Sequence, residues 1–198
     1  MVKFFEKNSK TPHQKLCFGA GLVQHRAPLW CWVLSQSPFQ TQKIGKILAK
    51  EFLKTFTKTA LVLGLIGDLG GGKTTFLQGF AKGLGIKEKI LSPSFVIFRK
   101  FKVKNLKPST RTELGAGPVP HRNEVSGAGF KVFYHIDCYR ISKPKEILNL
   151  GFKEIISNPQ NIVAIEWADR IKKILPKGTL ILKFNFINRN QREIEILS

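Results

Sequence analysis

Hydrophobic residues along this chain form two short uninterrupted runs. Residues 60–66 (ALVLGLI) are apolar, residues 161–165 (NIVAI) are apolar after Asn161, and both runs are bounded by turn-forming or polar residues. Runs of this length without polar alternation are typical of strands that are buried on both faces of a sheet. The pattern therefore predicts two interior strands about 100 residues apart in the sequence.

Elsewhere the apolar positions repeat with helical spacing. Residues 41–54 (TQKIGKILAKEFLK) carry apolar side chains near every third or fourth position, behind Thr41 as a candidate N-cap. A second helix is predicted from Lys73 to Gly83 or Gly85, with Phe76, Leu77, Phe80 and Leu84 on one side. Both segments are expected to be amphipathic helices that cover a sheet.

Further strands and one short helix follow. Residues 94–101 and 131–136 are predicted strands, residues 142–150 a helix that stops at Gly151, and residues 179–187 and 192–197 two strands around the turn-prone NRN. Strands that alternate with helices favour a mainly parallel α/β sheet flanked by helices, with an antiparallel addition at the C-terminal end. We expect one domain over residues 41–198, preceded by an extension over residues 1–40 that is poorly ordered in part.

Two segments lack a usable apolar period and contain nearly the same short sequence. Residues 8–29 contain GAGLVQHR and residues 105–129 contain GAGPVPHR, which agree at six of eight positions. Two copies are too few for a stacked repeat architecture. We interpret them as a repeated insertion and expect exposed, poorly ordered additions, the second of them a loop between two strands; the less favoured alternative is a duplicated binding element that carries His25 and His121.

The net charge of +20 makes a polyanion such as RNA a partner to consider. The charge is spread along the whole chain, so a lysine-rich solvated surface explains it equally well. The three cysteines, Cys17, Cys31 and Cys138, have neither zinc-ligand spacing nor an even count, which favours a reducing compartment. The apolar stretch at 16–34 is interrupted by His25 and Arg26, so we expect no membrane span and a cytoplasmic protein.

The most specific motif is GDLGGGKTT at residues 67–75. It fits the phosphate-binding pattern G-x-x-x-x-G-K-[ST] and lies between a predicted buried strand and a predicted helix, which is the context that the pattern requires. Glycines allow the backbone to bend around phosphates and to point its N–H groups at them. Lys73 is expected to bridge the β- and γ-phosphates, and the Thr74 hydroxyl to take one position around Mg²⁺.

A metal beside a phosphate needs an acidic group as well. Asp137 ends the strand VFYHID, and Glu166 ends the strand NIVAIEW. Either carboxylate is a candidate to bind Mg²⁺ or to orient the attacking water. Tyr139 and Trp167 beside them are interpreted as packing residues.

In combination these motifs resemble one family. GDLGGGKTT, SPSF at 92–95, HIDCYR at 135–140, LGF at 150–152, IEW at 165–167 and LP at 175–176 look like the bacterial tRNA threonylcarbamoyladenosine biosynthesis ATPase family TsaE (YjeE). The resemblance covers about residues 41–197 apart from the loop after Phe101, and TxxIGxxLA at 41–49 is similar to the family's N-terminal helix near the nucleotide. Three positions depart from the family pattern: Gly71 replaces alanine, Ser94 replaces threonine and Cys138 replaces leucine.

The resemblance implies a P-loop ATPase that acts with TsaB and TsaD in modifying tRNA. Carried over by position, the nucleotide-binding residues are Thr41, Gly67, Asp68, Leu69, Gly70, Gly71, Gly72, Lys73, Thr74 and Thr75. Thr74 and Glu166 would hold Mg²⁺, and Asp137 would lie by the γ-phosphate or its water, with Asp137 and Lys73 as the catalytic pair. Ser92 and Ser94 would form a switch-like segment, and Cys138 would pack as a small hydrophobic residue. Contact with tRNA would be indirect or through the basic surface.

Three other functions remain as alternatives. A small-molecule kinase would need an acceptor site and a lid arginine, and Arg111 and Arg122 lack that context. A GTPase would normally carry NKxD, which the sequence does not contain, so adenine is favoured over guanine. An RNA-binding module without enzymatic activity would explain the charge but leave the phosphate-binding motif unexplained.

Overall fold

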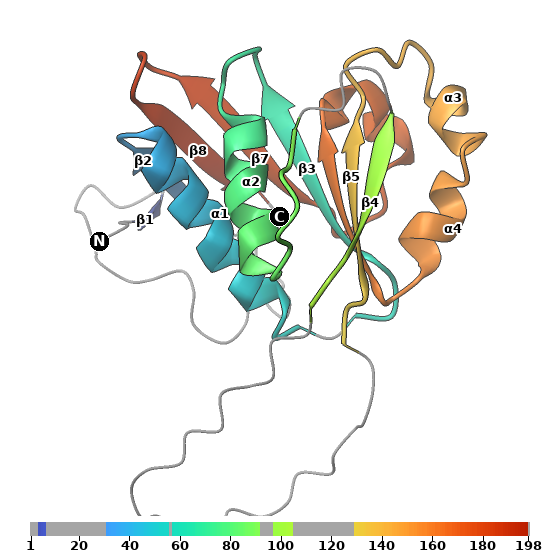
Figure 1. The fold of residues 1–198 in the computed structure, drawn as a ribbon. Helices are drawn as coiled ribbons and strands as arrows, with labels where there is room; N and C mark the ends of the chain where they lie inside the picture. The colour runs from blue at the N-terminus through green and yellow to red at the C-terminus, as the bar shows by residue number, and fades with distance from the viewer. Residues whose placement is uncertain (1–3, 7–30, 56, 92–96, 105–128, 198) are drawn as a thin grey trace, which may run out of the picture.

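The computed structural model describes residues 4–6, 31–55, 57–91, 97–104 and 129–197. The two segments that share GAG-x-V-x-HR, including His25 and His121, and the predicted switch residues Ser92 and Ser94 lie outside these ranges. The described residues form one eight-stranded sheet in the order β1-β2-β8-β7-β3-β6-β5-β4, with helices on both of its faces (Figure 1).

The centre of the sheet is parallel, as the alternation of strands and helices predicts. It consists of β7 (Leu180–Phe186), β3 (Leu61–Gly67), β6 (Asn161–Glu166) and β5 (Val132–Asp137), each parallel to its neighbour. All six residues of β6 are buried, which explains why its sequence shows no polar alternation. The predicted α/β class and both interior strands are confirmed.

Antiparallel strands extend the sheet at both edges. β8 (Arg192–Leu197) pairs with β7, which confirms the predicted C-terminal hairpin. At the opposite edge β4 (Phe98–Lys102) runs antiparallel to β5. Beyond β8 lie β2 (Cys31–Ser35) and β1 (Phe4–Glu6), two strands from the segment that the sequence assigns to an extension.

β2 was not predicted, although its side chains alternate in burial. Cys31 and Val33 are buried, and Trp32 and Leu34 are half-buried. Five residues of mixed polarity next to a segment without apolar period give a weak signal on their own. β2 becomes a strand because β8 offers it an open edge and the hydrophobic core continues beneath it.

The long helices α1 (Pro38–Phe52) and α2 (Lys73–Gly83) cover one face of the sheet. The other face carries α3 (Pro144–Leu148), α4 (Phe152–Ser157) and the 3-10 helix η1 (Ala168–Ile174) (Figure 1). Thr41 is not the N-cap of α1, because Ser37 takes that position and its hydroxyl accepts the Gln40 N–H. Gly151 is not the stop of the preceding helix either: α3 ends at Leu148, and Gly151 is the N-cap residue of α4, with φ = 78°.

Close contact between α1 and α2 fixes the start of α2 against the sheet. A Cβ atom on Gly45 would lie 2.3 Å from the Phe76 carbonyl oxygen, and one on Gly79 would lie 1.9 Å from the Gln42 carbonyl oxygen. The two helix backbones therefore touch where these glycines face them. Phe76 and Phe80 fill the space between α2 and the sheet, with Phe76 against Phe184 of β7.

Candidate functional site

Three parallel strands end side by side at the place where the sequence motifs fall. Glu166, the last residue of β6, is the register partner of both Leu65 in β3 and Asp137 at the end of β5. In open parallel sheets, ligands bind at the carboxyl ends of the strands. The topology thus brings the two predicted carboxylates next to each other and next to the glycine-rich loop.

The loop between β3 and α2 has the backbone that a phosphate cradle needs. Gly67, Gly70 and Gly72 have φ values of 138°, 75° and 95°, which residues with a Cβ rarely adopt. At Gly67 a Cβ would also lie 2.4 Å from the Phe184 carbonyl oxygen. The N-terminus of α2 has no side-chain cap, so its first N–H groups face the loop without a capping partner.

Lys73 is held inside the loop. Its Nζ donates to the Gly67 carbonyl oxygen at 2.6 Å and to the Asp68 carbonyl oxygen at 2.8 Å, and it lies 4.0 Å from the centre of the Trp167 ring. With only 4% of the residue exposed, burial lowers the pKa of Lys73 below its ordinary value of 10.5, while the carboxylates of Glu166, Asp137 and Asp68 oppose that shift. The ammonium group is therefore poorly hydrated. A bound anion could replace the two carbonyl oxygens as its hydrogen-bond acceptor.

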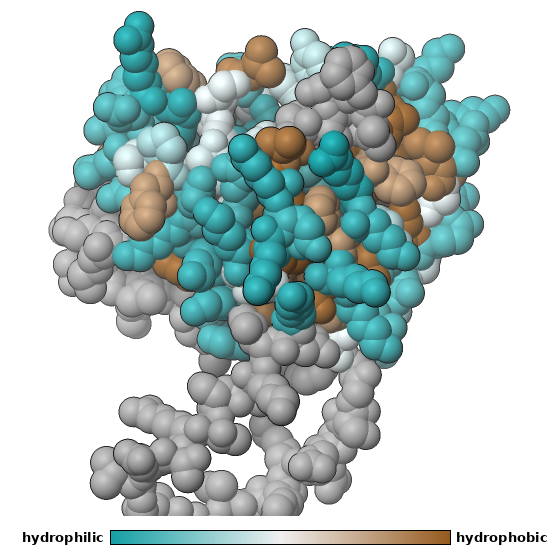
Figure 2. All heavy atoms as spheres, viewed as in Figure 1, coloured by the Kyte–Doolittle hydropathy of each residue, from teal (hydrophilic) through white to brown (hydrophobic). Residues whose placement is uncertain are grey.

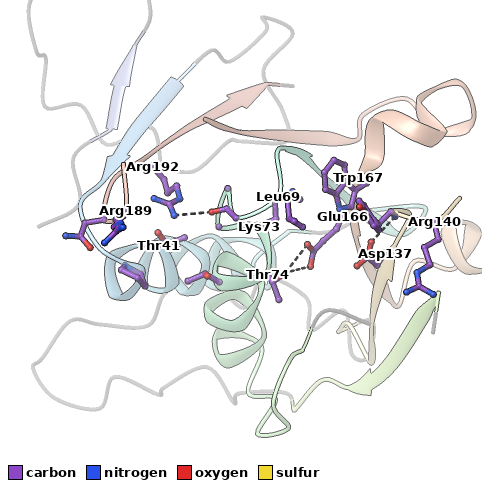
Figure 3. Close-up of a pocket in the computed structure, with 17 residues that line it drawn as sticks. Thr41, Leu69, Lys73, Thr74, Asp137, Arg140, Glu166, Trp167, Arg189 and Arg192 are labelled. Carbon is purple, nitrogen blue, oxygen red and sulfur yellow. Dashed lines mark hydrogen bonds between the residues drawn. The ribbon is translucent and has the colours of Figure 1, made fainter. Parts of the chain in front are cut away.

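Thr74 and Glu166 are in direct contact, as Figure 3 shows. The Thr74 hydroxyl lies 2.9 Å from Glu166 Oε1 and 3.0 Å from Oε2. Glu166 is 3% exposed, and its Oε1 is also 2.9 Å from His135 Nε2. A hydroxyl and a carboxylate at this distance form a set of hard oxygen donors, of the kind that Mg²⁺ prefers.

Asp137 is half-buried at the end of β5, beside Glu166 on the adjacent strand. Its Oδ1 accepts the Tyr139 N–H at 2.9 Å, which fixes the turn after β5. Cys138 beside it is fully buried, and burial raises the pKa of its thiol to about 12. The predicted packing of Cys138 as a small hydrophobic residue is therefore confirmed, and the thiol is protonated at neutral pH.

A pocket of about 390 Å³ joins these groups, within the size range of small-molecule sites. Its lining includes eight of the ten residues predicted to bind nucleotide, together with the two predicted carboxylates: Thr41, Leu69, Gly70, Gly71, Gly72, Lys73, Thr74 and Thr75, and Asp137 and Glu166. Gly67 and Asp68 do not line it, and they contribute instead by holding Lys73 with their carbonyl oxygens. Thr41 is itself buried, and its hydroxyl lies 2.7 Å from that of Ser35 in β2.

The turn between β7 and β8 supplies a wall of the pocket that sequence reasoning missed. Arg189, Asn190 and Arg192 line it. Arg189 and Arg192 lie at the end occupied by Thr41, whereas Asp137 and Arg140 lie at the other end (Figure 3). Arg192 Nη2 donates to the Gly70 carbonyl oxygen at 3.0 Å, so the hairpin is tied to the loop. The only signal in the sequence was NRN with a following arginine, which is typical of any polar turn.

Trp167, interpreted as a packing residue, lines the pocket as well. Its backbone has φ = 58°, and among the described residues no other residue with a side chain has a positive φ. Its ring contacts Tyr139, with 5.1 Å between ring centres, as well as the Lys73 ammonium. Trp167 therefore packs and borders the site at once.

The described ranges contain neither a cluster of metal-ligating side chains nor a helix that could span a membrane. Within them, there is no group of three or more His, Cys, Asp or Glu side chains that could hold a metal ion without other ligands. Any cation at Thr74 and Glu166 would therefore have to share its coordination with a bound anion or water. In the same ranges, no helix has the length and apolarity needed to cross a membrane.

Comparisons with known proteins agree with this geometry. A family model described as "Threonylcarbamoyl adenosine biosynthesis protein TsaE" matches residues 35–111 and 121–194. Relatives named tRNA threonylcarbamoyladenosine biosynthesis protein TsaE include one from Nostoc sp., 37% identical over 79% of this chain and 78% of its own. Another, from Bacillus subtilis, is 33% identical over 80% of this chain and 79% of its own. The crystal structure of Bacillus subtilis YdiB matches with a TM-score of 0.59 and 27% identity over 88% of each chain.

Proposed function

This chain belongs to the TsaE family, and we propose that it serves threonylcarbamoyladenosine modification of tRNA by binding and hydrolysing ATP. The observation that carries the proposal is the placement of Lys73, Thr74 and Glu166 around the glycine-rich loop. A lysine, a hydroxyl and a carboxylate around such a loop are the groups that nucleotide triphosphates need.

The loop would bind the phosphate chain through its backbone. Three glycines with positive φ would let the backbone bend around the phosphates, and the uncapped start of α2 would add N–H groups and the positive end of its dipole. Lys73 would exchange the Gly67 and Asp68 carbonyl oxygens for phosphate oxygens. That exchange is favourable because charge-assisted hydrogen bonds to phosphate are stronger than those to a neutral carbonyl.

Thr74 and Glu166 fit a magnesium ion that enters with the nucleotide. Both present oxygen atoms within 3.0 Å of each other, and Mg²⁺ typically takes one or two protein ligands together with phosphates and water. When bound, the ion would neutralise charge on the phosphates. Asp137, at the end of the adjacent strand, would then orient the attacking water, so that Asp137 and Lys73 act in turnover.

We propose TsaB and TsaD as protein partners, and the cytoplasm as the compartment, on the basis of family membership. The switch-like role of Ser92 and Ser94 stays a prediction, because both lie outside the described residues. The test is a pull-down of TsaB and TsaD from the same organism with and without ATP, together with ATPase assays of the mixture. Assembly that depends on ATP supports the proposal; absence of ATP binding in the full mixture rejects it.

Contact with tRNA through the basic surface is a separate part of the proposal. Lys43, Lys46 and Lys50 are exposed along α1 and Lys54 is exposed just after it, and Figure 2 shows mostly hydrophilic residues on the face that it views. Lysines that contact phosphates make binding depend steeply on salt. Binding of tRNA to the purified protein should therefore weaken as salt increases, and a flat dependence would argue for indirect contact.

A further inference from the structure

His135 is a polar residue in the interior of the sheet that the proposed mechanism leaves without a role. It lies on β5, two residues before Asp137, and none of its surface is exposed. Because side chains alternate along a strand, His135 shares the α1–α2 face of the sheet with Phe133 and Asp137. Phe133, two residues earlier on the same face, is equally buried and packs its apolar ring against Phe80 and Phe101.

One nitrogen of the imidazole has a partner and the other does not. Nε2 lies 2.9 Å from Glu166 Oε1, whereas Nδ1 is buried without a hydrogen-bond partner among the described residues. A carboxylate oxygen accepts hydrogen bonds, so the hydrogen belongs on Nε2. The tautomer with Nε2–H leaves Nδ1 as a bare acceptor and avoids burying an unpaired N–H.

The unpaired nitrogen argues against a purely structural role. A buried polar atom without a partner costs about 1–3 kcal/mol. An apolar side chain of similar size would avoid that cost at a position surrounded by core residues. What His135 adds, and an apolar residue would not, is the hydrogen bond to Glu166.

Glu166 needs such an anchor. Its two oxygens meet Thr74 on one side, and His135 approaches Oε1 from its own strand. The Thr74 hydroxyl would turn its oxygen toward a bound cation and so would no longer serve as a fixed donor to the carboxylate. His135 would then hold Oε1 in place, with Oε2 directed at the pocket.

We propose that His135 is a positioning residue: its Nε2–H fixes the Glu166 carboxylate in the orientation that the magnesium–nucleotide complex requires. The inference rests on the proposed function for the identity of the ligand, and on the structure for the contact itself. Hydrogen-bonded partners behind a metal ligand typically change metal affinity by 10–100-fold when they are removed.

The first test uses wild-type protein without ligand. Nitrogen-15 NMR distinguishes the two imidazole tautomers, and the His135→Gln variant assigns the signal among the four histidines. We expect the Nε2–H tautomer, and a shifted His135 signal in Glu166→Gln. An Nδ1–H tautomer, or a His135 chemical shift that is the same in wild type and Glu166→Gln, overturns the proposal.

The second test compares His135→Leu, which removes the donor, with His135→Gln, whose side-chain N–H has a similar reach. Phe133→Leu, on the same face of the same strand, is the control for disturbed packing. The measurement is the Mg²⁺ concentration that gives half-maximal binding of a fluorescent ATP analogue, with thermal unfolding measured in parallel. We expect that concentration to rise about tenfold or more in His135→Leu, and to stay near the wild-type value in His135→Gln and Phe133→Leu.

Two results overturn the proposal in this test: a folded His135→Leu with wild-type Mg²⁺ dependence, or His135→Gln as impaired as His135→Leu. If His135→Leu does not fold, the comparison of His135→Gln with wild type and the NMR result decide. If wild-type protein shows no Mg²⁺-dependent binding, the proposed function fails, and the NMR test alone decides whether His135 positions Glu166.

Discussion

The Thr74 hydroxyl lies 2.9 and 3.0 Å from the two carboxylate oxygens of Glu166, although 92 residues separate them in the sequence. The contact exists because β6 is parallel to β3 in a register that ends β6 beside the loop from which α2 begins. Two residues that are unremarkable in isolation thereby become one oxygen-donor pair.

The first prediction separates this pair from the neighbouring acid. Glu166→Gln keeps the shape of the side chain but removes its charge, so Mg²⁺-dependent nucleotide binding should weaken about tenfold or more, or ~1.4 kcal/mol or more. Asp137→Asn should reduce turnover more than binding, because Asp137 is assigned to the attacking water. Titration of Mg²⁺ at fixed nucleotide, followed by single-turnover hydrolysis, checks both variants. Equal Mg²⁺ dependence in Glu166→Gln and wild type would remove Glu166 from the metal site.

Whether a part of this site can be predicted from the sequence depends on how far apart in the chain the interacting residues are. The loop from Gly67 to Thr75 could be predicted because its chemistry lies in consecutive residues between a strand and a helix. Asp137 and Glu166 could be predicted as strand-end carboxylates, but their adjacency is set by the register of β5 on β6. The hydrogen bond from Arg192 to the Gly70 carbonyl oxygen joins residues 122 positions apart. Its acceptor is a backbone atom, so no pattern of side chains in the sequence predicts it.

The same dependence on distant contacts explains why some features of the fold were not predicted correctly. β2 depends on the free edge of β8, a strand more than 150 residues later, and its own five residues carry little signal. The sequence does not identify the N-cap of α1, because Thr41 and Ser37 are both good capping residues and only the backbone decides between them. Local chemistry predicted the interior strands and α2, whereas the edges needed tertiary contacts.

The second prediction concerns the charge of Lys73. Burial lowers its pKa below 10.5, so the ammonium loses its proton at lower pH than an exposed lysine would. Binding that depends on this cation should be complete at neutral pH and should fall as pH rises through the lowered pKa. Affinity for a non-hydrolysable ATP analogue, measured from pH 7 to 10, should decline in wild type.

Lys73→Met is the matched control for this experiment. It should bind about 10–100-fold more weakly at neutral pH, from the loss of charged hydrogen bonds worth ~1.5–3 kcal/mol, and should change little with pH. It should also fail to hydrolyse ATP in the presence of TsaB and TsaD. Parallel curves for wild type and Lys73→Met would show that another group causes the pH dependence.

The third prediction concerns the hairpin wall of the pocket. Arg192 stacks 4.5 Å from the centre of the Phe186 ring and donates to the carbonyl oxygens of Gln191 and Gly70. Arg192→Ala should therefore loosen the loop and weaken nucleotide binding, with a smaller effect on thermal stability because the hairpin tip is exposed. Lys183→Ala is the control, since it removes a cation of the same hairpin that does not line the pocket. If both variants bind nucleotide equally well, the tie to Gly70 has no role in binding.

The last prediction tests the contact between α1 and α2 that places the loop. In an ordinary helix, replacing an interior glycine by alanine stabilises the helix by up to ~1 kcal/mol. At Gly79 the opposite is expected, because the added Cβ would lie 1.9 Å from the Gln42 carbonyl oxygen, and a backbone atom cannot rotate away. Forced overpacking typically costs about 1–3 kcal/mol, so Gly79→Ala should unfold several degrees below wild type. Lys82→Ala, at an exposed position of the same helix, should leave the unfolding temperature nearly unchanged.

Since α2 begins at Lys73, a displaced helix would move Lys73 and Thr74 together, and Gly79→Ala should therefore also bind nucleotide more weakly at temperatures where it is fully folded. Wild-type stability in Gly79→Ala would mean that α1 and α2 are further apart than the structure has them.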